Sequence, residues 1–197
     1  MLSHRAEQLS RIAFELDMKF SPRDNWGLIN FLEDFKLFRR GFGKRISNIL
    51  HRQDAMLNLD LYIFDYRFTI STGNSARVIK QTVFFVQSHK LGLPVFYMRP
   101  ETVFHRIGAY LGMQDIDFEE YPRFSNNYTL RGDDEDFIRS TANPSFLHFF
   151  SIEKNWFLEG VNYYLIFYRK GKRLKPKEIK EFYTKGLEIY KLLTTPT

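Results

Sequence analysis

The stretch from Leu57 to Ile70 reads LNLDLYIFDYRFTI and is dominated by the Leu, Ile, Phe and Tyr residues that favour strands. Turn-forming residues follow it at Ser71–Ser75, and a second β-forming run, Val78–Ser88, comes directly afterwards. Two such runs around a glycine-containing loop predict a long β-hairpin at the centre of the fold.

Shorter runs on both sides of this hairpin predict the rest of a sheet with about six or seven strands. The further predicted strands are Ile46–His51, Leu93–Met98, Asn127–Leu130, Asn155–Glu159 and Tyr163–Tyr168. The last two are expected to form a second hairpin across Gly160. Pro94 suits a strand end or an edge strand, because proline donates no hydrogen bond to a neighbour.

Helices are predicted at both ends of the chain, where apolar residues recur at helical spacing. The predicted helices are 3–17, 28–35, 100–112, one beginning at 133, 146–150 and 177–193. Residues 21–25 are expected to break the first one. We therefore predict a single domain over 1–197, with a helical N-terminal part (1–35), a β-rich core with inserted helices (45–170) and a C-terminal helix (176–194).

This order of elements predicts an α+β fold, because strands and helices do not alternate as they do in a doubly wound sheet. The expected architecture is a curved antiparallel sheet or a partly open barrel. Up to seven strands followed by a closing helix is also the order of a pleckstrin-homology-like barrel, and that alternative stays open.

Composition excludes several classes of function. The 197 residues include no cysteine, which excludes disulfides, zinc–thiolate sites and cysteine nucleophiles. No signal-peptide core is evident, and no run approaches the roughly 20 apolar residues of a spanning helix. We expect a cytoplasmic protein, with membrane association as the alternative, and we expect no cofactor. The net charge of +6 favours weak attraction to anionic partners.

The densest basic stretch is Arg169–Lys177, which contains the binding candidates Lys172, Arg173, Lys175 and Lys177. It could pair with phosphates of lipid or nucleic acid, or it could be a solvated loop before the last helix. A second basic stretch, Arg39–Arg45, contains a Gly-x-Gly-Lys sequence but lacks the spacer and the Ser/Thr of a phosphate loop. We interpret that stretch as a turn with two permissive glycines.

Asp65 interrupts the aromatic run, and a carboxylate inside a central strand must be paired or reach solvent. Arg67, Arg99 and Arg131 are its possible partners by composition. Either a structural ion pair or a ligand site would explain it.

Two further acidic features are candidates for chemistry. Glu101 and His105 would share a helix face at i and i+4, as an acid–base pair or as an ordinary surface contact. Asp115 and Asp117 would share one side of an extended segment, but the further ligands of a calcium loop are missing, and we expect no metal site.

Several pieces of the sequence together resemble a family of bacterial proteins that has no assigned activity. The pieces are Phe38–Gly41, Phe64–Tyr66, Gln81–Val83, Leu93–Phe96, Arg99–Glu101, Asp115–Phe118, Phe124–Ser125 and Tyr128–Gly132. The resemblance spans roughly residues 35–170 and implies a bacterial source. Some members look membrane-tethered, so the resemblance also implies possible membrane proximity. It supplies no catalytic residue.

The main functional hypothesis is a non-enzymatic binding or interaction domain for a protein or an anionic lipid surface. The first alternative is an enzyme in which Asp65, Arg99, Glu101, His105, Asp117 and Arg131 converge in one pocket. The second, less favoured, is weak and non-specific nucleic-acid binding. The sequence predicts no oligomeric state.

Overall fold

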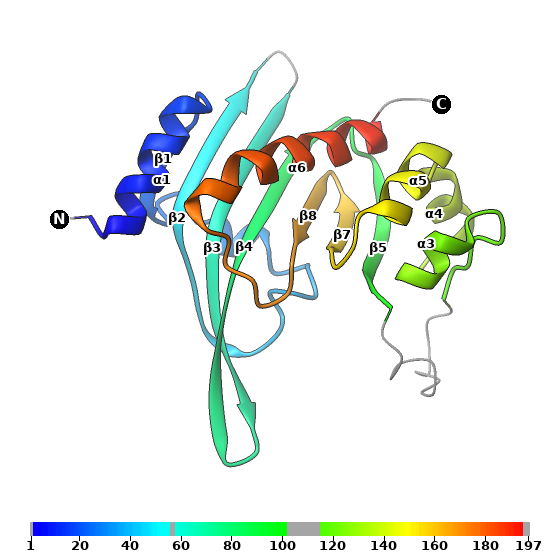
Figure 1. Ribbon diagram of the computed structural model, residues 1–197, viewed down its shortest axis with the longest axis horizontal. Coiled ribbons are helices and arrows are strands. Elements are labelled where there is room, and N and C mark those ends of the chain that lie inside the picture. Colours follow the sequence, from blue (N-terminus) through cyan, green and yellow to red (C-terminus); the bar gives the residue numbers. More distant parts are fainter. Residues whose placement is uncertain (1, 56–57, 102–114, 195–197) are drawn as a thin grey trace.

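The predicted central hairpin organises the sheet. In the computed structural model, which describes residues 2–55, 58–101 and 115–194, strands β3 (Leu59–Thr72) and β4 (Ser75–Ser88) pair along their whole length (Figure 1). The chain reverses at Gly73, whose φ of 67° suits glycine. The far end of this hairpin projects beyond the other strands (Figure 1).

Six further strands complete an antiparallel sheet in the order β1-β2-β3-β4-β8-β7-β5-β6. They are β1 (Lys19–Arg23), β2 (Phe42–Asp54), β5 (Leu93–Pro100), β6 (Tyr128–Gly132), β7 (Phe157–Asn162) and β8 (Tyr164–Tyr168). The sheet is open, with β1 and β6 as its edges. The α+β class with one antiparallel sheet between terminal helices is therefore confirmed.

Strand β1 corrects the prediction of a wholly helical N-terminal part. The residues expected only to break the first helix form an edge strand, with Phe20 opposite Leu50 and Ser21 opposite Ile49. Pro22 is tolerated there because an edge strand leaves one row of backbone groups without a neighbour.

The helices are α1 (His4–Glu15), α2 (Leu28–Phe31), α3 (Pro122–Asn127), α4 (Glu135–Thr141), α5 (Pro144–Ile152), the 3₁₀ turn η2 (Pro176–Glu178) and α6 (Ile179–Thr194). The predicted helix 28–35 is thus shorter than expected. The predicted helix 100–112 falls largely outside the described residues. In the part of the chain that the structure describes, no helix is long and apolar enough to cross a membrane.

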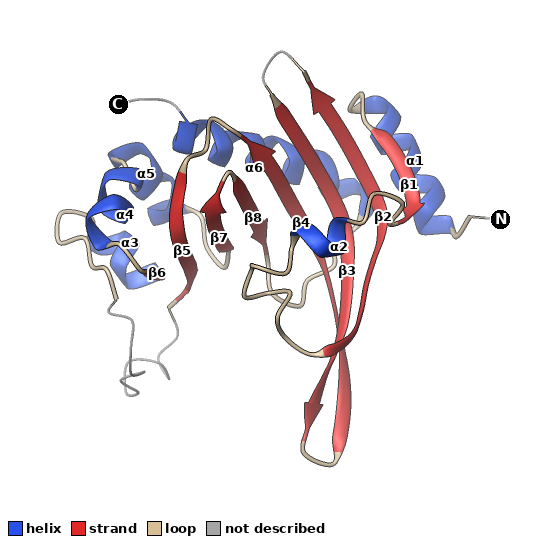
Figure 2. Ribbon diagram, turned by 180° about the vertical axis from the view of Figure 1, so that it is seen from behind, coloured by secondary structure: helices blue, strands red, loops and turns tan. Residues whose placement is uncertain are grey.

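The sheet carries a hydrophobic core on each face. On the helical face, α1 and the helices α3–α6 contribute buried residues to one core, in which α6 packs against the rings of Phe84 and Phe167. Gly186 of α6 lies so close to the ring of Phe84 that a side chain there would overlap it. On the opposite face, α2 and the loop after it cover β3 and β4 (Figure 2). There Phe38 packs on Tyr66, with ring centroids 4.4 Å apart.

The hairpin of β7 and β8 turns two residues later than predicted. Val161 pairs with Tyr164, so the turn lies at Asn162, which has a φ of 52°. Gly160 lies inside β7, and the ring of Phe96 fills the space where its side chain would be. Gly160 is therefore required for close packing and not for chain reversal.

Candidate functional site

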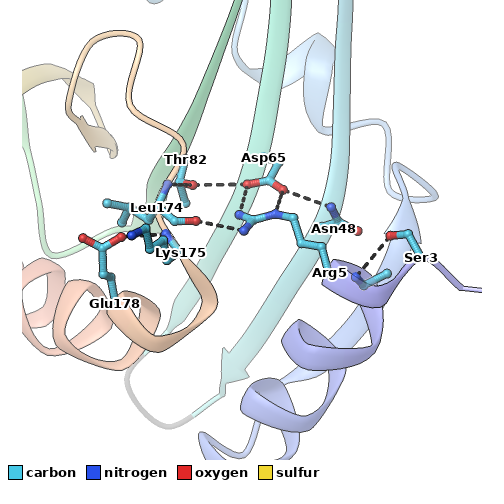
Figure 3. Close-up of polar contacts among 9 residues, drawn as sticks. Ser3, Arg5, Asn48, Asp65, Thr82, Leu174, Lys175 and Glu178 are labelled. Atoms are coloured by element: carbon cyan, nitrogen blue, oxygen red, sulfur yellow. Dashed lines mark hydrogen bonds and ion pairs between the residues drawn. The ribbon is translucent and has the colours of Figure 1, made fainter.

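The carboxylate of Asp65 is held by side chains from three other elements (Figure 3). Arg5 of α1 donates from Nε to Oδ2 and from Nη2 to Oδ1, both at 2.7 Å. Asn48 donates to Oδ2 at 2.9 Å, and Thr82 donates to Oδ1 at 3.1 Å. Asp65 is buried, and the two-pronged contact with a guanidinium is the strong form of a carboxylate pair.

The same network fastens the loop before η2 to the sheet. Arg5 also donates to the carbonyl of Leu174 at 2.8 Å, and Thr82 Oγ1 accepts from the backbone of Leu174 at 3.0 Å. The partner of Asp65 is thus Arg5, which corrects the partners proposed from composition. The carboxylate of Asp65 thus has a structural role, because its hydrogen-bonding capacity is taken up by contacts within the fold.

A polar pocket of about 410 Å³ lies beside this network on the helical face. We call it the basic pocket. It is lined by Leu2, Ser3, Ala6, Pro22, Arg23, Arg45, Ser47, Asn48, Asp65, Tyr66, Arg67, Lys80 and Arg173. Its acidic lining residue, Asp65, is already bound by Arg5, so the unneutralised charge of the pocket is positive.

Three of the lining cations lie side by side across the central strands, and we call them the cation row. Arg45 of β2 is directly opposite Arg67 of β3, and Arg67 is directly opposite Lys80 of β4. All three are exposed, and none forms an ion pair with an acidic residue in the described ranges. Like charges directly opposite each other destabilise a sheet, so this row works against folding stability.

The side chains of the basic stretch predicted at 169–177 do not gather at one place but lie in different environments. Arg169 stacks over the ring of Trp156 at 3.9 Å, and Lys172 Nζ lies 3.2 Å from a carboxylate oxygen of Glu178. Arg173 lines the basic pocket. The remaining two candidates of this stretch are exposed: Lys175 is the N-cap of η2, and Lys177 lies within η2. One member of the stretch therefore joins the basic pocket.

The two glycines of the Arg39–Arg45 stretch have positive φ, 68° at Gly41 and 61° at Gly43. This confirms the interpretation as a turn that needs permissive glycines. The turn leads into β2 and positions Arg45 in the cation row.

Other predicted residues gather on the opposite face, over β5 and β6. Arg99 is opposite Thr129, and Arg131 is opposite Tyr97. Glu101 accepts a short hydrogen bond from the hydroxyl of Thr129. His105 lies outside the described residues.

Arg131 is engaged by a carboxylate predicted as a possible metal ligand. Its Nε and Nη2 donate to Asp115 at 2.6 and 3.1 Å. Asp117 uses its backbone carbonyl to accept from Arg139. Within the ranges that the structure describes, no group of three His, Asp or Glu side chains could hold a metal ion.

Glu159 of β7 is a buried acid that the sequence analysis missed. It is 2% exposed and accepts from the backbone nitrogens of Lys36 and Leu37 at 2.6 and 3.2 Å and from the Tyr168 hydroxyl at 2.9 Å. Burial raises the pKa of Glu159 to about 7. Its isolated position in an apolar strand is the same signal that singled out Asp65.

Asp65 and the Arg99–Arg131 group do not share a site. Asp65 is two residues from Ile63 and therefore shares the helical face with it, whereas Arg99 is next to Met98 of the helical-face core and so lies on the other face. Strands β3 and β5 are also four positions apart, roughly 19 Å at the usual strand spacing. The single convergent pocket required by the enzyme alternative is therefore not formed by these residues.

No family model and no curated protein matches the chain. Its fold is similar to that in the crystal structure of the mycobacterial trehalose monomycolate transport factor A, TtfA, with a TM-score of 0.66. The match covers 100% of both chains at 10% sequence identity. At that identity the likeness shows a shared fold over the whole length.

Proposed function

We propose that this chain is a non-enzymatic binding domain that docks on an anionic lipid surface through the basic pocket. The observation that carries the proposal is the cation row, in which Arg45, Arg67 and Lys80 lie in register and have no acidic partner among the residues that the structure describes. An anionic surface would relieve their mutual repulsion. Near an anionic membrane each basic residue contributes about 1 kcal/mol of binding free energy.

The lining of the pocket favours lipid headgroups over single-stranded nucleic acid. Nucleic-acid grooves of this kind place aromatic rings among the cations so that bases can stack. The aromatic residue lining the basic pocket is Tyr66, which is 1% exposed and packs its ring against Phe38 and Phe68. The pocket thus offers charge without a stacking platform.

The structural likeness gives this proposal a second support. The similar fold belongs to a protein named as a trehalose monomycolate transport factor. The likeness therefore supports a lipid-related role as part of this proposal. The residues that would perform it here come from this chain's own pocket.

Vesicle flotation tests the proposal. The variant R45A/R67A/K80A removes the cation row, and R11A/K90A/R123A is a matched control that removes the same charge from exposed sites elsewhere. We expect wild type and control to float with vesicles of phosphatidylcholine and phosphatidylglycerol, and the row variant to bind about 100-fold more weakly. Equal binding by the two variants, or equal binding of wild type to pure phosphatidylcholine, would overturn the proposal.

A further inference from the structure

The turn before β2 presents an aromatic side chain to solvent. Phe42 is 59% exposed and lies between Gly41 and Gly43, both in the left-handed region. A side chain at Gly41 would overlap the carbonyl of Thr69, so the glycine lets the turn lie against β3. The pairing of β2 with β3 is irregular between Phe42 and Arg45. The glycines thus hold a large apolar residue at the surface.

Phe42 belongs to a row of side chains that crosses the same three strands as the cation row. It is opposite Thr69 of β3, which is opposite Val78 of β4, and Val78 is 47% exposed. We call Phe42 and Val78 the apolar pair. Thr69 and Val78 each lie two residues from a member of the cation row, so both rows occupy the same face. The Thr69–Val78 pairing is nearer the turn at Gly73 than the Arg67–Lys80 pairing, so the apolar pair lies toward the projecting end of the hairpin.

Single exposed apolar residues are common on soluble proteins and need no explanation. This pair differs because an unneutralised row of cations lies next to it on the same face. Membrane-surface segments combine these two features, with cations at the headgroup phosphates and apolar side chains in the acyl boundary. The charge of the adjoining row selects an anionic membrane as the occupant.

We propose that the apolar pair enters the acyl boundary of an anionic membrane when the cation row binds the lipid phosphates. The proposal rests on the function proposed above and adds which side chains enter the lipid. It also explains the Arg39–Arg45 stretch, in which basic residues flank Gly41-Phe42-Gly43. The projecting end of the hairpin is then the part of the fold that contacts lipid.

Substitutions matched for exposure test this assignment. F42S and V78S remove the apolar pair one member at a time, and F31S and V95S are controls at residues that are 53% and 45% exposed. On vesicles of phosphatidylcholine with an equal share of phosphatidylglycerol, we expect F42S to bind about tenfold more weakly and V78S a few-fold more weakly. Both controls should bind like wild type.

A tryptophan at the turn reports insertion directly. In F42W we expect a blue shift of the added emission on the same vesicles and quenching by lipids with brominated acyl chains. V95W is the control and should show neither change. The thermal unfolding of each variant verifies that it is folded.

The outcomes separate the two proposals. If the cation-row variant loses binding but F42S binds like wild type and F42W shows no quenching, the docking proposal holds and the insertion proposal is overturned. If neither the row variant nor F42S loses binding, both are overturned. Loss of binding in both, with quenching of F42W, supports both.

Discussion

Asp65 and Arg67 are two residues apart on the same face of β3, yet the fold treats them differently. Asp65 is buried and receives donors from Arg5, Asn48 and Thr82. Arg67 is exposed and lies between two other cations. The carboxylate of Asp65 is occupied by contacts that join distant parts of the chain. The charge of Arg67 lowers the stability of the fold, which is expected of a residue whose role is to bind a ligand.

The largest expected effect on stability comes from removing the buried Asp65 carboxylate. Asp65→Ala leaves the Arg5 guanidinium, 16% exposed, without its carboxylate, and we expect a loss of about 3–5 kcal/mol in the free energy of unfolding. Urea denaturation of wild type and variant measures it. A matched control is Asp117→Ala, an exposed acid for which we expect less than about 0.5 kcal/mol. A loss below about 1 kcal/mol for Asp65→Ala would contradict the structural role.

Glu159 is a second buried acid, and it differs from Asp65 because its hydrogen-bond donors are two backbone nitrogens and a tyrosine hydroxyl. Its pKa in the folded protein is about 7, above the ordinary value of 4.5, so the folded state binds a proton more readily than the unfolded state. Its contribution to stability is therefore fully present below the ordinary pKa and is lost as the pH rises through about 7. Between these two pKa values the free energy of unfolding falls by an amount on the order of 3 kcal/mol.

Glu159→Gln should remove this pH dependence. Unfolding free energies measured across the interval between the two pKa values should fall with rising pH for wild type and stay nearly flat for the variant. Glu135→Gln, at an exposed helical site, should behave like wild type. An unchanged pH profile in Glu159→Gln would show that Glu159 is not the group responsible.

The smallest expected effect on stability comes from changing the charge of the exposed Arg67. Arg67→Glu replaces two like-charge contacts with opposite-charge contacts to Arg45 and Lys80, and we expect a gain of about 0.5–1 kcal/mol in unfolding free energy. The same variant should bind anionic vesicles more weakly than wild type. A loss of stability would mean that Arg67 makes a favourable contribution to the fold.

The long hairpin and the fold class could be predicted because they depend on local composition and turn chemistry. Strand β1 could not, since Pro22 and its neighbours carry turn signals and form a strand only against β2. The sequence identified Asp65 as an exception in its strand. It could not identify Arg5, because that contact joins residues 60 positions apart.

The candidate site shows the same limit. The cation row depends on the pairing register of three strands, including an irregularity between Phe42 and Arg45 that no local pattern reveals. The faces of the sheet likewise separate Asp65 from Arg99 and Arg131, and the sequence does not reveal which face each strand residue takes. Glu159 carried a local signal, an acid in an apolar strand, and the sequence analysis missed it.

The salt dependence of vesicle binding distinguishes docking through the cation row from attraction by net charge. Binding through unpaired cations is screened by salt, so the partition coefficient of wild type on anionic vesicles should fall steeply as ionic strength rises. We expect a much shallower fall for R45A/R67A/K80A and the steep wild-type fall for the control R11A/K90A/R123A. The same slope for both variants would show that net charge governs binding, and would contradict docking through the cation row.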